Sequence, residues 1–96
     1  SFAPVTDTGL ADLPPNLRIL RLRKAKVSDA GLEHLNGLTC LENLYLGETM
    51  VAGPGLSHLR RLTNLQRLVL WRTPVTKTDP VVKRLQEALP RLKIVW

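Results

Sequence analysis

The chain has 96 residues, enough for one small domain that buries about 60–65% of the surface exposed by its unfolded form. Hydrophobic residues make up 44% of it and aromatic residues only 4%, which excludes a disordered chain and requires an aliphatic core. The 14 Lys and Arg residues outnumber the 8 Asp and Glu residues, and the net charge of +6 favours an acidic protein, a nucleic acid or an anionic membrane as a partner.

Cysteine content and hydropathy indicate whether the chain can form disulfides, span a membrane or carry a signal peptide. Cys40 is the single cysteine, so no internal disulfide can form. No apolar run approaches the roughly 18 residues of a membrane-spanning helix, and we expect no span. Residues 1–4 lack the basic and apolar regions of a signal peptide, and the absence of an initiator methionine leads us to expect a processed or truncated N-terminus.

One pattern, L-x-x-L-x-L, recurs along the whole chain. Val27, Val51 and Val75 are spaced 24 positions apart, and the stretches that follow Val27 and Val51 share columns of leucine, glycine, histidine and threonine. Copies of the pattern stand at 17–22, 41–46 and 65–70, with a truncated copy at 89–94. The repetition predicts a single domain spanning 1–96, built of repeats at about 5–26, 27–50, 51–74 and 75–96.

Each repeat combines two periodicities. The alternation in L-x-L is typical of a strand, and the spacing of three in G-L-x-x-L-x-x-L suits a short helix or 3₁₀ turn. Neither segment can bury its apolar side alone, so successive repeats must stack with strand beside strand in a parallel sheet. Thr49 and Thr73 follow two of the predicted strands, where a buried hydroxyl is expected to hydrogen-bond the backbone, whereas Ala25 occupies the same column and cannot.

The end repeats differ from the middle ones. Pro14 and Pro15 shorten the first repeat by two residues, which predicts a shortened helical segment there. Asp79 and Pro80 form a capping residue and a first helical proline, which predict a helix at about 80–88. Residues 92–96 are then expected to close the sheet, with Trp96 covering the end of the core, and Phe2 is a candidate cap at the other end.

The repeat resembles that of a leucine-rich repeat protein, in the 24-residue subclass V-T-D-x-G-L-x-x-L-x-x-L-x-x-L-x-x-L-x-L-x-x-T known from bacteria, planctomycetes especially, and similar to the ribonuclease-inhibitor class. The resemblance covers nearly all of residues 5–96. It implies an α/β fold: a short right-handed leucine-rich-repeat solenoid with four parallel strands on its concave face and short helices on its convex face. It also implies a binding scaffold, because most such proteins bind other molecules.

The residues between the inward leucines of each strand should point outward on the concave face. Ile19, Asn43, Gly47, Val69 and Val95 are among these positions. The remaining ones are basic or aromatic and form the predicted partner-binding set, which consists of Arg21, Arg23, Tyr45, Arg67, Trp71, Arg91 and Lys93.

Trp71, predicted to be exposed among arginines, has the composition of an interface hot spot, and arginine suits contact with carboxylates. The set therefore predicts a docking surface for an acidic protein partner, as in an accessory subunit or scaffold. Two alternatives remain open: a solvated face whose charges maintain solubility, and a nucleic-acid-binding surface built from the same basic and aromatic side chains.

Catalytic and metal-binding patterns are weak. His34 and His58 share one column with Asp12 one repeat earlier, which could form a pH-sensitive pair or weak metal site, but outward surface histidines copied with the repeat explain them better. Cys40 is expected to be a partly buried, inert thiol. No phosphate-binding loop or catalytic triad can be assembled. We therefore expect no enzymatic activity, cofactor or metal.

Overall fold

The structure is a computed structural model that describes residues 10, 13–24 and 26–96. The expectations for Phe2, Asp12 and Ala25 lie outside the described residues. The elements in chain order are β1 (Ile19–Arg21), α1 (Asp29–Leu32), the 3₁₀ helix η2 (Glu33–Gly37), β2 (Asn43–Tyr45), the 3₁₀ helix η3 (Gly53–Leu59), β3 (Arg67–Val69), α2 (Pro80–Ala88) and β4 (Lys93–Val95).

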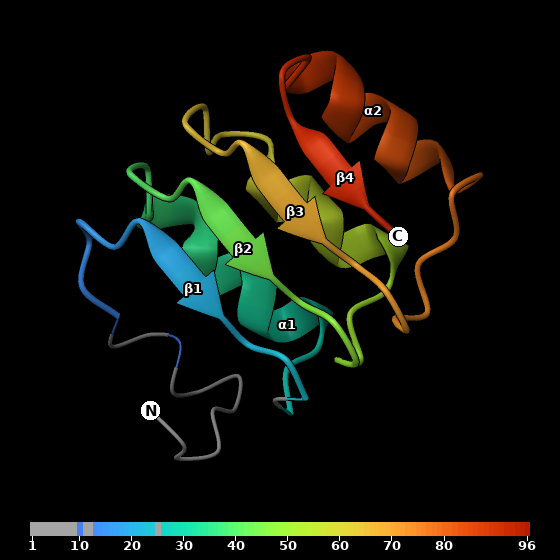
Figure 1. The fold of residues 1–96 in the computed structure, drawn as a ribbon, viewed down its shortest axis with the longest axis horizontal. Coiled ribbons are helices and arrows are strands. Elements are labelled where there is room, and N and C mark those ends of the chain that lie inside the picture. The colour runs from blue at the N-terminus through green and yellow to red at the C-terminus, as the bar shows by residue number, and fades with distance from the viewer. Residues whose placement is uncertain (1–9, 11–12, 25) are drawn as a thin grey trace.

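The four strands form one parallel sheet in the order β1-β2-β3-β4. Figure 1 shows them side by side, with all the helical segments in a second layer behind them. Each return from one strand to the next passes through that second layer, as the two periodicities of the repeat predict. The parallel sheet and the stacked repeats expected from the sequence are therefore confirmed.

The helical layer is made of short segments whose type differs from repeat to repeat. The second repeat carries α1 continued by η2, and the third carries only η3, whose first residues include Pro54. The fourth carries α2 over Pro80–Ala88, the segment predicted from the sequence. The Asp79 side chain accepts a hydrogen bond from the Val81 N–H at 3.0 Å and so caps this helix.

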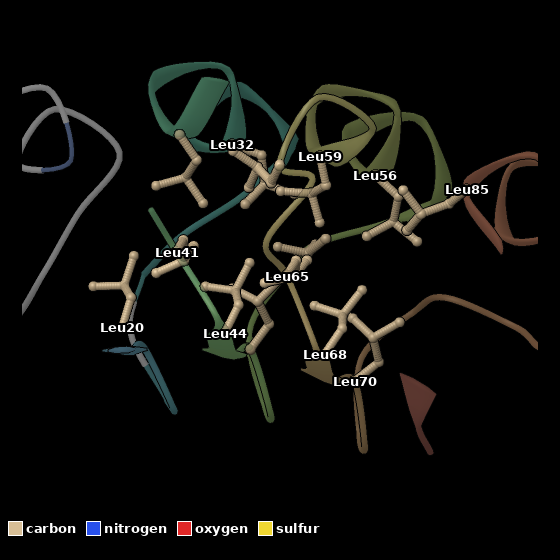
Figure 2. Close-up of a cluster of buried hydrophobic side chains, with 14 of the residues drawn as sticks. Leu20, Leu32, Leu41, Leu44, Leu56, Leu59, Leu65, Leu68, Leu70 and Leu85 are labelled. Carbon is tan, nitrogen blue, oxygen red and sulfur yellow. The ribbon is translucent and has the colours of Figure 1, made fainter. Parts of the chain in front are cut away.

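The core lies between the two layers and is almost entirely leucine and valine. Figure 2 shows leucines from the strands, such as Leu44 and Leu68, pointing toward leucines of the helical layer, such as Leu32 and Leu59. All four of these side chains are fully buried. Burial of each such side chain contributes about 1.5–3 kcal/mol relative to exposure, so this layer of leucines is the main stabilising term.

Threonine hydroxyls bond to the backbone in the turns that follow β2 and β3, as predicted. The Thr49 hydroxyl donates to the Leu46 carbonyl at 2.7 Å, and the Thr73 hydroxyl donates to the Leu70 carbonyl at 2.6 Å. Thr49 is buried and Thr73 is half-buried, so each hydroxyl pairs a backbone carbonyl that solvent reaches poorly.

The last repeat corrects one detail of the sequence interpretation. Ile19, Asn43 and Arg67 pair at steps of 24 positions, but Arg67 pairs with Lys93, a step of 26. The final strand is therefore shifted by two residues from the predicted copy at 89–94. Arg91, predicted on the strand, lies in the turn before β4. The half-buried Trp96 packs against the core at the end of the sheet, as expected.

Candidate functional site

The candidate site is the face of the sheet that points away from the helices, which we call the sheet face. Its side chains form rows across the strands because the strand register aligns them. The first row is Ile19, Asn43, Arg67 and Lys93; the second is Arg21, Tyr45, Val69 and Val95; and a third, just beyond the strands, is Arg23, Gly47 and Trp71.

Trp71 lies flat enough against Gly47 that the glycine is buried beneath it. A Cβ atom placed on Gly47 would be 3.1 Å from Trp71 Cε2 and 3.3 Å from Trp71 Nε1. The side chain of Trp71 is consequently half-buried, which corrects the expectation of an exposed tryptophan. Because the neighbouring position is glycine, the sheet face gains a flat aromatic surface whose position is fixed by the backbone of the adjacent coil.

Two arginines also contact the Trp71 ring. The Arg23 guanidinium carbon lies 5.1 Å from a ring centroid, and that of Arg72 lies 5.5 Å from it. These are cation–π distances. Arg23 reaches Trp71 across Gly47, which has no side chain to separate them. The Trp71 ring therefore contacts Arg23, Gly47 and Arg72, which come from three successive repeats.

Glu48 joins the same two arginines. Arg23 Nε donates to Glu48 Oε1 at 3.1 Å, and Arg72 Nη1 lies 3.7 Å from Glu48 Oε2. The hydrogen bond from Arg23 is the main cause that holds the pKa of the Glu48 carboxyl below its ordinary value, while partial desolvation acts in the opposite direction. The charges of Lys24, Arg23 and Arg72 lower this pKa further.

The backbone places Glu48 between its cationic neighbours. Lys24, Glu48 and Arg72 occupy the same column of three repeats, and each has a left-handed backbone, with φ of 61°, 60° and 59°. The Lys24 N–H donates to the Gly47 carbonyl at 3.0 Å, and the Glu48 N–H donates to the Trp71 carbonyl at 3.0 Å. The turns therefore stack in register, and the column alternates positive, negative and positive.

Arg67 and Lys93 form the other basic part of the sheet face. They are direct register partners on β3 and β4, both are exposed, and neither has an acidic partner among the described residues. Arg21, at the other side of the sheet, lies with its guanidinium carbon 5.6 Å from the Tyr45 ring centroid. Arg18, by contrast, is paired with Glu42 at 3.2 Å.

The structure thus brings six of the seven predicted partner-binding residues onto one face and leaves the seventh beside it. Arg91 is exposed in the turn before β4, near Thr63 and Leu65. Val69, predicted to be outward, is on this face but is covered by its neighbours. Sequence reasoning assigned no role to Glu48 or Gly47. Glu48 shares its repeat position with Lys24 and Arg72, and Gly47 shares its position with Arg23 and Trp71. The alignment of the repeats therefore marked each of them as a neighbour of these basic and aromatic residues.

The other chemically reactive residues lie apart from the sheet face. His34 belongs to η2 and is exposed, and His58 belongs to η3 and is half-buried, so both are on the helical layer as expected. Cys40 is exposed, not partly buried, because it lies in the turn between η2 and β2. Among the described residues no group of His, Cys, Asp and Glu could hold a metal ion, and no helix could cross a membrane.

Comparison with known proteins identifies the fold. No family model matches the chain, and no curated protein matches it. Among solved structures, a leucine-rich repeat protein of Leptospira interrogans aligns with a TM-score of 0.58 over 88% of this chain, at 21% sequence identity. The chain has a leucine-rich-repeat fold. It spans 28% of the length of that protein.

This likeness confirms the α/β leucine-rich-repeat architecture expected from the sequence. The 24-residue bacterial subclass, the domain limits and the partner-binding set stay predictions.

Proposed function

We propose that this leucine-rich-repeat chain is a non-enzymatic protein–protein interaction module that docks an acidic partner through the sheet face. The observation that carries the proposal is the pair formed by Arg67 and Lys93. Like charges on directly paired positions of neighbouring strands are destabilising, and no acidic residue of the described chain pairs with these two. A carboxylate of a partner would relieve that repulsion and gain two charged contacts.

Apolar and aromatic groups adjoin the basic pair. Val69 is the direct neighbour of Tyr45 in the second row, and Trp71 follows two residues later on the same strand and turn. Aromatic side chains beside arginine are enriched among the residues that contribute most to protein–protein binding. Because Trp71 is held against Gly47, little side-chain freedom is lost when a partner covers it.

Ser57 lines several shallow hollows on the helical layer. A hollow of about 340 Å³ lies between η3 and α2 and is lined by Ser57, Arg60, Val81, Arg84, Leu85 and Ala88. This lining contains no histidine, cysteine or carboxylate that could act as a general base or activate the serine. Ser57 shares an adjoining hollow with His58, but that lining contains no carboxylate to orient the imidazole, and the Ser57 hydroxyl donates to the Pro54 carbonyl at 2.9 Å.

Affinity capture from the native source tests the proposal. The wild-type chain is compared with Arg67→Glu and with Trp71→Ala, and each captured protein is identified and its affinity is then measured. We expect at least a tenfold loss of affinity for both variants, which corresponds to about 1.4 kcal/mol. Lys83→Glu is the matched control, because Lys83 is exposed on α2 and its reversal changes the net charge equally.

Two results would contradict the proposal. Equal weakening by Arg67→Glu and Lys83→Glu would show that net charge alone attracts the partner. Tight, salt-dependent binding of mixed-sequence RNA in a mobility-shift assay, without a captured protein, would instead support the nucleic-acid alternative, because phosphate contacts release counterions.

A further inference from the structure

Glu48 places a negative charge among the basic residues beside Trp71. Its carboxylate accepts from Arg23 at 3.1 Å and lies 3.7 Å from Arg72, so it occupies two of the cations that an acidic partner could use. The Glu48 side chain is 19% exposed, whereas those of Arg23 and Arg72 are 59% and 74% exposed. The Glu48 carboxylate is therefore less accessible to solvent than the two arginines that contact it.

The geometry of the cluster fixes this acid in place. The Glu48 backbone is left-handed and its N–H is bonded to the Trp71 carbonyl, so the side chain starts from a turn that stacks on the next coil. Arg23 and Arg72 are held at the same time by the Trp71 ring. Each arginine thus has both an anionic and an aromatic contact before any partner arrives.

Arg67 and Lys93 are in the opposite situation. Neither has an acidic contact within the described chain, and the two stand side by side on adjacent strands. A carboxylate that approaches them meets uncompensated positive charge. Near Trp71, Arg23 and Arg72 already contact Glu48. A partner carboxylate that binds these two arginines there must compete with Glu48 for them.

We propose that Glu48 divides the sheet face into an acid-binding end at Arg67 and Lys93, which have no acidic contact among the described residues, and an end at Trp71, where Arg23 and Arg72 are already paired with Glu48. The Trp71 end takes an apolar group of the same partner segment. This inference rests on the proposed function and specifies the chemistry of the partner. The row formed by Tyr45 and Val69 joins the two ends with apolar surface. At about 3.3 Å per residue, position 71 lies roughly 13 Å along the chain from position 67.

The partner segment that fits this face therefore carries its carboxylates at one end and an apolar or aromatic side chain about 13 Å away. A uniformly acidic segment fits less well, because its charges at the Trp71 end would face Glu48. Glu48 acts here as a specificity-determining residue: because it already pairs with Arg23 and Arg72, it lowers the attraction of the Trp71 end for the carboxylates of a partner.

A residue-resolved NMR titration tests the division. The probe is hexaglutamate, acetylated and amidated at its ends, added to the ¹⁵N-labelled 96-residue chain. In the wild type we expect the largest shift changes at Arg67 and Lys93, and changes at most a third as large at the Arg23 and Arg72 Nε–H and the Trp71 Nε1–H. In Glu48→Gln we expect these Trp71-end signals to respond as strongly as Arg67, with affinity for the probe increased about threefold.

Glu42→Gln is the matched control. It adds the same charge and frees Arg18, which pairs with Glu42 at the other end of β2, so it should raise the response at Arg18 and leave that at Arg23 and Trp71 unchanged. Glu48→Asn is a second variant, since asparagine accepts the left-handed backbone of this position. The dispersion of each spectrum shows whether the variant is folded.

The inference is overturned if hexaglutamate perturbs Trp71 and Arg67 equally in the wild type, if it perturbs neither, or if both Glu48 variants fold and leave the Trp71 end unresponsive. Failure of the proposed function is separate. It would appear as capture of a partner that Arg67→Glu and Trp71→Ala do not weaken, whatever the peptide titration shows.

Discussion

The outward residues of the sheet face have three different roles. Trp71 and Gly47 form a fixed apolar contact, Glu48 pairs with the two arginines around that contact, and Arg67 and Lys93 have no acidic contact among the described residues. The leucine repeat predicted which residues point outward, because alternation in a strand depends only on position. It could not predict the Trp71–Gly47 contact, since that depends on the orientation of one ring across two coils.

The ionisation of Glu48 provides the first prediction at this scale. Its pKa is lowered, chiefly by the hydrogen bond from Arg23, so the ionised form is favoured by folding. The stabilisation is present above the ordinary pKa of 4.5 and is lost as the pH falls through the lowered value. We expect the Glu48 carboxyl carbon to titrate below 4.5 by NMR, and its midpoint to rise in Arg23→Gln.

The control for this titration is Arg18→Gln, which removes an arginine from the Glu42 pair and not from Glu48. The Glu48 midpoint should not move in that variant. A midpoint in the wild type at or above the ordinary value of 4.5, or one that Arg23→Gln leaves unchanged, would contradict the ion-pair geometry of the cluster.

Thr49 provides the second prediction. Thr49→Val keeps the shape of the side chain but removes the hydroxyl that donates to the Leu46 carbonyl in a buried turn. We expect a loss of about 1–2 kcal/mol in the free energy of unfolding, measured by urea denaturation. Thr73→Val removes the equivalent bond in a half-buried turn, where water can replace it, and should cost less. Equal or larger loss at Thr73 would contradict this explanation.

At the scale of the element, the last repeat shows both the success and the failure of sequence reasoning. The helix limits at Pro80 and Ala88 were predicted because Asp79 and Pro80 are start signals that act locally. The register of β4 was predicted wrongly, because residues 89–94 imitate the spacing of earlier copies while two extra residues lengthen this repeat. The choice between the two registers depends on packing against β3, which the local pattern does not contain.

The cap of α2 provides the third prediction. Asp79→Ala removes the side chain that accepts from the Val81 N–H, and we expect a loss of about 1 kcal/mol in the free energy of unfolding by urea denaturation. Thr78→Ala is the control, because Thr78 is exposed and precedes the capping residue; its effect should stay within about 0.5 kcal/mol. A larger effect at Thr78 would mean that Asp79 is not the residue that caps the helix.

At the scale of the whole molecule, one continuous leucine core joins all four coils. Each coil buries its apolar side only against its neighbours, so a short array of this kind should unfold as a unit. This property could be predicted from the sequence, because the leucine columns place a buried side chain in every coil regardless of the outward residues.

Leu44 provides the fourth prediction. It lies on β2 with coils on both sides and is fully buried, so Leu44→Ala should cost about 2–5 kcal/mol through lost burial and the cavity left behind. We expect circular dichroism and tryptophan fluorescence to give coincident urea transitions in the wild type, and one transition at lower urea in the variant. Separate transitions for the two probes would contradict a single cooperative core.

The central claim is that the sheet face, and not the helical layer, meets the partner, and radical footprinting of the captured complex tests it most directly. Hydroxyl radicals oxidise accessible aromatic side chains. We predict that oxidation of Tyr45 and Trp71 falls at least threefold in the complex, while that of His34, exposed on η2, is unchanged. Protection of His34 without protection of Tyr45 and Trp71 would contradict the account and assign docking to the helical layer.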